Sequence, residues 1–593
     1  MTLLEVKGLT IAYAGAREPA VDRLSFAVNA GESLGLVGES GSGKTQTALG
    51  ILGLLPPQAK VGGQVLFDGV DLLGKGVKIL NRYRARRVAM VFQDPQQALN
   101  PYLTIGEQLR RVLLEHRIVR ARDTRQRAFE LLRRVGLPDA ERQYRAWPHQ
   151  LSGGMRQRAM IALALSCEPE LLIADEPTTA LDVTLQAQVL QLLQKLRAES
   201  GIALMLITHD LGVVAGNCGR MLVLHHGRML EQGLTTTVFQ SPVQEITRAM
   251  LAATVSVDDP APPAPAASGS PPVLSVDKLE VTFSDTRFGW RPQTAHSAVR
   301  GVTFSLGAGE TVAVVGESGS GKTTVARAIV GLALKGRGTV SLSGESLAGR
   351  VRFRPLDQRR DLQMVFQDPV ASLDPAMKVG RIIAEPVELH EPRLGRAEYD
   401  QRVVAVLGRV GLDDSLLQRF PHELSGGQAQ RVAIARALVL EPKVLICDEA
   451  VVALDGTVRR AVLDLLQAEQ RRSGLSLLFI THDLAVVRQI SHRVLVMYMG
   501  RICEHADNDA LFRRPRHPYT RALMDAVPVA DPTRGPRPAP GVGEVSSAGI
   551  PSGCAFHPRC EYAQPRCRTE RPELERIDGS DVACHRAGEI DLR

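Results

Sequence analysis

The chain has 593 residues, of which 44% are hydrophobic and 23% charged, and a formal net charge of +8. This length exceeds what one hydrophobic core serves, so we expect several domains. Charged residues interrupt the apolar runs before they reach the length of a membrane span, and the first residues lack the basic and apolar segments of a secretory signal. The net charge suits an anionic partner or, more simply, an arginine-rich solvated surface. Because aromatic residues make up only 4% of the chain, a nucleic-acid partner is not expected.

Five sequence motifs occur twice, in the same order and at nearly constant spacing. They are GESGSGKT (Gly38–Thr45 and Gly316–Thr323), VFQDP (from Val91 and Val365), LSGG (from Leu151 and Leu424), Asp-Glu (at 175 and 448) and Thr-His-Asp (at 208 and 481). Such a repeat indicates a duplicated domain. We predict domains at residues 1–252 and 273–527, a Pro/Ala-rich linker at 253–272 and a C-terminal tail at 528–593.

Short apolar runs precede the motifs of each copy. In the first copy they cover residues 33–38 (SLGLVG), 170–176 (ELLIADE) and 204–210 (LMLITHD), and a helical pattern covers 156–166. Runs this short, apolar at successive positions, are typical of strands buried on both faces. Strands that alternate with helices predict an α/β fold with a parallel sheet, whose ligands bind at the carboxyl ends of the strands.

The GESGSGKT segment follows a predicted strand and precedes a predicted helix, as a phosphate-binding loop does. Its glycines allow backbone N–H groups to surround phosphates at a helix N-terminus, where the helix dipole favours negative charge. The lysine is expected to reach the β- and γ-phosphates, and the threonine hydroxyl to bind Mg²⁺. The predicted nucleotide ligands are Gly38, Ser40, Gly41, Gly43, Lys44 and Thr45 in the first copy, and Gly316, Ser318, Gly319, Gly321, Lys322 and Thr323 in the second.

Acidic and histidine residues follow two further predicted strands of each copy. Asp175, at the end of a buried strand, is expected to hold Mg²⁺, and Glu176 to polarise the attacking water as a general base. His209 can hydrogen-bond the γ-phosphate and that water. A single Asp-Glu pair or a single histidine is commonly structural, so the hypothesis depends on the recurrence of this set as Asp448, Glu449 and His482.

These motifs, in this order, resemble the ATP-binding-cassette (ABC) family over about Leu3 to Arg521. The resemblance implies two cassettes, each with a parallel-sheet core, an antiparallel β part and a helical subdomain. It also implies that they face each other head to tail, each LSGG completing the ATP site of the other cassette. The residues assigned on this basis are Gln93 and Gln367 (ATP and Mg²⁺), Tyr13 and Phe283 (adenine stacking), Ser425, Gly426 and Gly427 (site of the first loop), and Ser152, Gly153 and Gly154 (site of the second loop). An insertion at about residues 285–297 separates Phe283 from its loop.

The two copies depart from the family pattern in different ways. Met155 stands where Gln428 keeps the commoner glutamine after LSGG, and Ala450 stands where the first copy has Pro177. Gly456 is expected to weaken the start of its helix by about 0.5–1 kcal/mol relative to alanine. Both glutamates and both histidines are present, so we expect two competent sites, which need not turn over equally.

Other segments resemble the peptide and nickel importer group of that family. VFQDPQQALNP and VFQDPVASLDP are similar to its glutamine loop, and RHPYTRALMDAVP (Arg516–Pro528) is similar to its C-terminal tail. The resemblance implies an ATPase at the cytoplasmic face of the cell membrane that powers import of di- or oligopeptides. Its implied partners are two integral-membrane permease subunits and an extracytoplasmic solute-binding protein. Nickel or glutathione as the solute, and a soluble tandem-cassette ATPase acting on the ribosome, remain alternatives.

Four of the eight cysteines lie close together near the C-terminus: Cys554, Cys560, Cys567 and Cys584. In a reducing compartment such a group suggests a metal site rather than disulfides. Four thiolates can hold a [4Fe–4S] cluster, and this tail resembles those that carry one in some peptide-importer ATPases. Zinc and the absence of any metal are the alternatives. The expected cofactors are therefore ATP, Mg²⁺ and a [4Fe–4S] cluster, with zinc in place of the cluster as the alternative.

Overall fold

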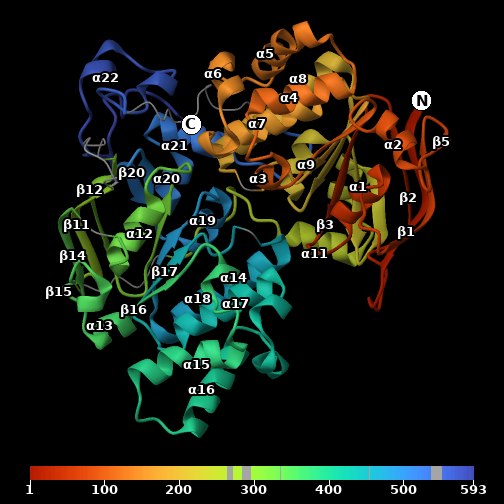
Figure 1. Cartoon of the computed structure of the whole chain (residues 1–593). Helices are drawn as coiled ribbons and strands as arrows, with labels where there is room; N and C mark the ends of the chain where they lie inside the picture. Colours follow the sequence, from red (N-terminus) through yellow and green to blue (C-terminus); the bar gives the residue numbers. More distant parts are fainter. Residues whose placement is uncertain are drawn as a thin grey trace. The chain divides into compact units, whose positions relative to one another are not determined.

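The computed structural model describes residues 1–179, 181–263, 271–283, 296–333, 336–452, 454–535 and 550–592. They form two compact units, one from Met1 to Thr254 and one from Val255 to Val527. The segment that begins at Pro528 belongs to the first unit, and the segment that ends the chain belongs to the second. Figure 1 colours the first unit from red to yellow and the second from green to blue. Most of the insertion after Phe283 and the middle of the linker lie outside the described residues.

The described strands of the first unit form two sheets. A four-stranded antiparallel sheet has the order β2-β1-β4-β5, and a six-stranded sheet has the order β10-β9-β3-β8-β7-β6. In the larger sheet β3, β6, β7, β8 and β9 run parallel, and β10 pairs antiparallel with β9. The bounds are β1 (Thr2–Tyr13), β2 (Val21–Asn29), β3 (Ser33–Gly38), β4 (Ala59–Phe67), β5 (Val70–Asp71), β6 (Val88–Val91), β7 (Leu171–Asp175), β8 (Ala203–Thr208), β9 (Arg220–His225) and β10 (Arg228–Leu234).

The predicted central strands are confirmed, because every residue of β3, β7 and β8 is buried. One core lies between the two sheets of the first unit, and a second packs the larger sheet against helices. The helices are α1 (Lys44–Leu52), α2 (Val77–Tyr83), α3 (Pro95–Ala98), α4 (Ile105–Glu115), η1 (Ala121–Asp123), α5 (Thr124–Arg134), α6 (Ala140–Arg145), η2 (Pro148–Gln150), α7 (Gly153–Ala164), α8 (Val183–Ser200), α9 (Leu211–Asn217), α10 (Thr235–Gln240) and α11 (Glu245–Ala253).

The second unit repeats this plan. Its antiparallel sheet has the order β12-β11-β14-β15, and its larger sheet has the order β16-β17-β18-β13-β19-β20-β22-β21. Strands β13, β17 and β18 are again buried along their whole length. The bounds are β11 (Leu274–Phe283), β12 (His296–Leu306), β13 (Thr311–Val315), β14 (Arg337–Leu342), β15 (Glu345–Ser346), β16 (Leu362–Val365), β17 (Val444–Asp448), β18 (Ser476–Ile480), β19 (Arg493–Tyr498), β20 (Arg501–Asp507), β21 (Glu575–Ile577) and β22 (Ser580–Val582).

The helices of the second unit occur in the same order as those of the first. They are α12 (Lys322–Val330), η3 (Val351–Phe353), α13 (Leu356–Asp361), α14 (Pro369–Ser372), α15 (Val379–His390), α16 (Arg396–Arg409), η4 (Asp414–Gln418), η5 (Pro421–Glu423), α17 (Gly426–Leu438), α18 (Gly456–Ser473), α19 (Leu484–Ile490), α20 (Asn508–Arg513) and α21 (Pro518–Asp525), followed in the tail by η6 (His557–Arg559) and α22 (Pro565–Thr569). Gly456 is the first residue of α18, and the side chain of Asp455 caps that helix.

The C-terminal region is more ordered than the coil that the sequence predicts. Strands β21 and β22 form a short hairpin, and β22 pairs with β20, so the tail extends the large sheet of the second unit. Each strand has only three residues. A strand this short leaves no alternating pattern in the sequence, and its pairing depends on the edge offered by β20.

Candidate active sites

The first phosphate loop joins the buried end of β3 to the start of α1. A Cβ at Gly38 would lie 2.3 Å from the carbonyl oxygen of Leu224, so the close approach of β9 requires a glycine. Gly43 has a φ of 97°, and a Cβ there would lie 2.4 Å from the carbonyl oxygen of Ala20. The buried Lys44 Nζ donates to the carbonyl oxygens of Gly38 and Glu39, both at 2.8 Å. The lysine is thus held inside its own loop, and its contact with phosphates stays a prediction.

The second phosphate loop has the same local geometry. Gly321 has a φ of 102°, and Lys322 Nζ donates to the carbonyl oxygens of Gly316 at 2.7 Å and Glu317 at 2.9 Å. Lys322 is as deeply buried as its counterpart. Both loops open an α-helix of nine residues, which places the helix N-terminus at the loop.

Glu176 lies directly after β7, with a positive φ of 44° that turns its side chain out of the strand. Gln93 Nε2 donates to Oε2 of Glu176 at 3.0 Å, the Thr179 hydroxyl donates to the same oxygen at 2.8 Å, and His209 Nδ1 lies 3.2 Å from Oε1. Burial opposes ionisation, but the hydrogen bond with His209 and its neighbours outweigh it, and the pKa of Glu176 is lowered. The carboxylate is therefore ionised and oriented, as a general base must be.

Glu449 has the same surroundings in the second unit, with one difference. Gln367 Nε2 donates to its Oε2 at 2.6 Å, and His482 Nδ1 lies 3.3 Å from its Oε1. Burial is again outweighed, here by His482 and Lys322, and the pKa of Glu449 is lowered. The residue at the place of Thr179 is Val452, which has no hydroxyl to donate. The sequence reasoning missed Thr179, although the different letters after the two Asp-Glu pairs could have drawn attention to it.

The predicted Mg²⁺ ligands lie together in each unit. Thr323 Oγ1 donates to Oδ1 of Asp448 at 3.0 Å, and the side chain of Thr45 is hydrogen-bonded to the carboxylate of Asp175. Within the described residues, Oδ1 of Asp175 is buried without a hydrogen-bond partner. A buried carboxylate oxygen is costly in free energy unless a cation or a hydrogen-bond donor binds it. Burial accordingly raises the pKa of Asp175 to about 6.

A hydroxyl and a carboxylate are the oxygen ligands that Mg²⁺ prefers, so these residues fit the ion. When bound, Mg²⁺ neutralises charge on the phosphates. Asp175 and Asp448 would hold it together with Thr45 and Thr323. Gln93 and Gln367 direct their amide nitrogens to the catalytic glutamates, which leaves their amide oxygens to serve as the predicted ligands.

Each LSGG motif begins a helix, with its serine as the N-cap. The Ser152 hydroxyl accepts a hydrogen bond from the backbone N–H of Met155, and that of Ser425 accepts one from Gln428, both at 3.2 Å. The backbone N–H of Ser425 donates in turn to Oε1 of the Gln428 side chain at 3.0 Å, which completes a capping box. The Met155 side chain has no oxygen that could accept the corresponding hydrogen bond from the backbone N–H of Ser152. The assembly of each motif with the loop of the other unit stays a prediction.

The two residues predicted to stack on adenine differ in their surroundings. Tyr13 ends β1, and its hydroxyl is hydrogen-bonded to the side chain of Gln46 on α1. The ring therefore lies at the helix that carries Lys44. Phe283 ends β11, and 51% of its surface is exposed.

The C-terminal tail contributes to the second phosphate loop, which the sequence reasoning missed. Arg559 Nη1 and Nη2 each donate to a carboxylate oxygen of Glu317 at 2.7 Å, and both side chains are almost fully buried. The backbone N–H of Glu317 donates to the Tyr519 hydroxyl at 2.8 Å. Tyr519 belongs to the HPYT segment of α21, which was the one available signal.

The four tail cysteines line one pocket together with His517 and His557. The backbone N–H of Cys554 donates to the carbonyl oxygen of Cys567, which brings the two segments together. Burial raises the pKa of Cys560 and of Cys584 to about 11. In the part of the chain that the structure describes, no three His, Cys, Asp or Glu side chains are arranged to hold a metal ion. The thiols therefore share a pocket without ligand geometry.

Comparison with known families decides the assignment. A family model described as "ABC transporter" matches residues 21–179 and 299–452, and one described as "Oligopeptide/dipeptide transporter, C-terminal region" matches residues 503–567. The chain belongs to the ABC transporter family. It is an ATPase of that family.

Several curated proteins are similar to this ABC transporter chain over most of its length. The glutathione import ATP-binding protein GsiA is 43% identical in Pectobacterium atrosepticum and 42% identical in Escherichia coli (strain K12), each alignment covering 90% of both chains. The peptidoglycan transport ATP-binding protein YejF of Agrobacterium fabrum is 44% identical, covering 88% of this chain and 96% of the relative. None of the helices in the described ranges combines the length and apolar character that a bilayer span requires.

Proposed function

We propose that this chain hydrolyses ATP to power the import of small peptides, including peptides of the size of glutathione, through a membrane permease. The observation that carries the proposal is that two ABC cassettes, each with a histidine beside a partly buried glutamate, occur in one chain whose C-terminal region matches the oligopeptide and dipeptide transporter family. The relatives that share most of its length are named for glutathione import and peptidoglycan transport, which supports a peptide-like solute over nickel.

The proposed partners are two integral-membrane permease subunits and an extracytoplasmic solute-binding protein, with the chain at the cytoplasmic face of the membrane. The test is reconstitution of the chain with the permease pair in vesicles. ATP hydrolysis should rise when the binding protein is loaded with a di- or tripeptide, and should not rise with nickel. Stimulation by ribosomes, with none from the permease vesicles, would overturn the proposal in favour of a soluble ATPase acting on the ribosome.

Each ATP site is proposed to be composite. Each LSGG motif begins a helix at its N-cap serine, Ser152 or Ser425, and the positive end of a helix dipole suits a γ-phosphate. On this arrangement Ser425→Arg blocks the site built on Lys44, although the two residues belong to different units. Nucleotide trapping resolved by site is the measurement, with Ser152→Arg as the reciprocal control. Loss confined to the Lys322 site in the Ser425→Arg protein would contradict the composite arrangement.

The four tail cysteines are proposed to hold a [4Fe–4S] cluster that stabilises the tail. Two observations support this proposal: the four cysteines line a common pocket, and all four candidate ligands are thiols. Anaerobically purified protein should be brown and contain about four irons per chain, and Cys560→Ser should remove the colour. Cys503→Ser is the matched control, since Cys503 is a buried cysteine of β20 outside the set. Stoichiometric zinc without iron would replace the cluster with a zinc site, and protein without metal would overturn both.

A further inference from the structure

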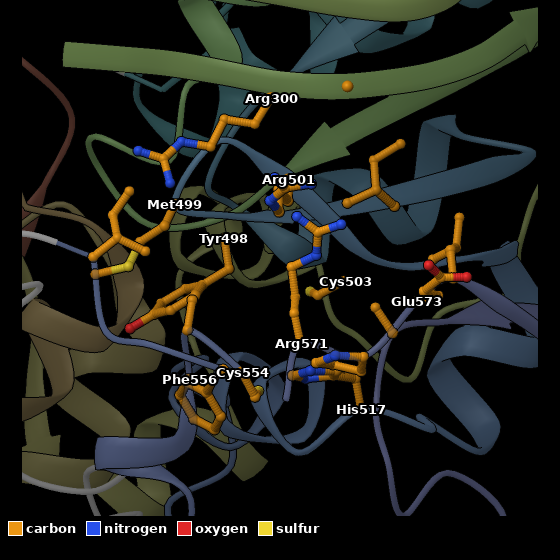
Figure 2. A pocket seen from close by; sticks show the side chains of 18 of the residues that line it. Arg300, Tyr498, Met499, Arg501, Cys503, His517, Cys554, Phe556, Arg571 and Glu573 are labelled. Carbon is orange, nitrogen blue, oxygen red and sulfur yellow. The ribbon is translucent and has the colours of Figure 1, made fainter. Parts of the chain in front are cut away.

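A cavity of about 680 Å³ lies within the second unit, and its lining residues do not include those assigned to ATP. Its wall is formed by β12, by the β19–β20 hairpin and by two parts of the tail, one around Cys554 and one between Cys567 and Cys584. Figure 2 shows the guanidinium groups of Arg501 and Arg571 directed toward one another, with Arg300 above them. The rings of Tyr498 and Phe556 line the opposite part of the wall.

The three arginines form a concentration of positive charge on the wall of the cavity. Burial, and then the like charges of Arg571 and Arg300, lower the pKa of Arg501, and the opposite charge of Glu280 offsets only part of this effect. Among the described residues, none of the three forms an ion pair. Glu280 lies opposite Arg300 in the pairing of β11 with β12, and Glu573 lies on the wall of the cavity. Within the described ranges, neither glutamate lies within ion-pair distance of Arg300, Arg501 or Arg571.

We propose that this cavity binds a small organic oxyanion that carries at least two carboxylate or phosphate charges. Guanidinium groups present paired N–H donors that match the two oxygens of such groups, and an anion would relieve the repulsion among the three arginines. The aromatic and aliphatic wall, including Ile502 and Leu574, suits a compact apolar body between the charged groups.

Occupancy of the cavity is coupled to the second ATP site. Tyr498 and Phe556 also contact Arg559, whose guanidinium carbon lies 6.0 Å and 5.6 Å from the two ring centres. Arg559 in turn binds the carboxylate of Glu317 in the second phosphate loop. An anion packed against these rings restrains Arg559 and so favours the ordered loop, which makes the cavity a site for an anionic effector of ATP hydrolysis.

The test is isothermal titration of the full-length Lys44→Ala/Lys322→Ala protein, whose phosphate loops lack their lysines, with citrate and, separately, with orthophosphate. We expect about one site per chain, and binding at least tenfold weaker in the added Arg501→Gln/Arg571→Gln variant. Arg576→Gln is the matched control, because Arg576 is 65% exposed on β21 and paired with Asp581 outside the cavity. Saturation by citrate alone identifies an organic carboxylate, and saturation by orthophosphate alone identifies a phosphate ligand.

The proposal is overturned if neither anion saturates the protein, or if the Arg501→Gln/Arg571→Gln variant binds as tightly as the Arg576→Gln control. If the glutamine variant fails to fold, Arg501→Lys/Arg571→Lys keeps the charge while removing the paired donors. It should weaken citrate binding several-fold, and unchanged binding there also counts against the proposal.

Discussion

The two phosphate loops have the same eight residues but different surroundings. In the second loop, Glu317 is buried, bound by both terminal nitrogens of Arg559 and held at its backbone N–H by Tyr519. In the first loop, the side chain of the corresponding Glu39 is 32% exposed, with His225 Nδ1 at 4.0 Å. An identical motif therefore specifies the fold of the loop without specifying how firmly the surrounding protein holds it. The tail, through Arg559, makes the second loop the more restrained one.

The catalytic glutamates differ in the opposite sense. Glu176 receives hydrogen bonds from Gln93 and Thr179 and contacts His209, whereas Val452 replaces the threonine beside Glu449. The first unit thus has the better-oriented base, and the second has the better-held phosphate loop. The two sites contain the same essential groups, and their rates are expected to be limited by different parts.

The largest effect is expected from removing both general bases, which tests whether the two sites share one chemistry. Glu176→Gln with Glu449→Gln keeps the hydrogen bonds but removes the proton acceptor, so steady-state ATP hydrolysis should fall by about 10²-fold or more while ATP still binds. Phosphate release and nucleotide binding are measured on the same protein. A double variant that keeps more than about a tenth of the rate would show that neither glutamate is the base.

The second prediction removes the contact that restrains the second phosphate loop more than the first. Arg559→Gln leaves the buried Glu317 carboxylate without its cation, which should destabilise the second unit by about 3 kcal/mol. Displacement of the loop should reduce hydrolysis at the Lys322 site by about tenfold. The measurement is nucleotide trapping resolved by site, together with urea unfolding.

The control for that prediction is Arg566→Gln, which removes an exposed arginine of the same tail that pairs with Glu570. It should leave both sites unchanged. If Arg559→Gln affected the Lys44 site as much as the Lys322 site, the tail would act on the whole protein and not on one loop.

The sequence predicts those parts of the fold and sites whose residues are close along the chain. The loop from Gly38 to Thr45, the Asp-Glu pairs and the buried strands that carry them depend on local patterns, and the structure confirms their placement. The contact of Arg559 with Glu317 joins residues 242 positions apart and depends on the folding of the tail onto the second unit. No local pattern encodes such a contact. The three-residue strands β21 and β22 were missed for the same reason.

A third prediction concerns Thr179, the hydroxyl that distinguishes the two bases. Thr179→Val gives Glu176 the surroundings of Glu449 and should lower turnover at the first site by about fivefold, since a hydrogen bond to a charged group contributes on the order of 1 kcal/mol or more. The variant is made in a Glu449→Gln background, so that hydrolysis reports the first site. The reciprocal Val452→Thr, in a Glu176→Gln background, should raise turnover at the second site. Equal rates for parent and Thr179→Val proteins would show that Gln93 and His209 orient the base without help.

The smallest effect is expected at the helix caps, where the two LSGG motifs differ by one residue. Gln428 closes a capping box on Ser425, and Met155 cannot do so on Ser152. Met155→Gln should therefore stabilise the start of α7 by about 0.5 kcal/mol, because a completed capping box satisfies a further backbone donor. Met155 also packs against the core of the first unit, and the lost apolar contact offsets part of this gain.

Gln428→Met is the matched control and should destabilise α17 by a similar amount or more. Urea unfolding of both variants measures the two differences, and opposite signs are expected. If Met155→Gln destabilised the protein as much as Gln428→Met does, the methionine would be retained for its packing and the caps of the two motifs would not be interchangeable.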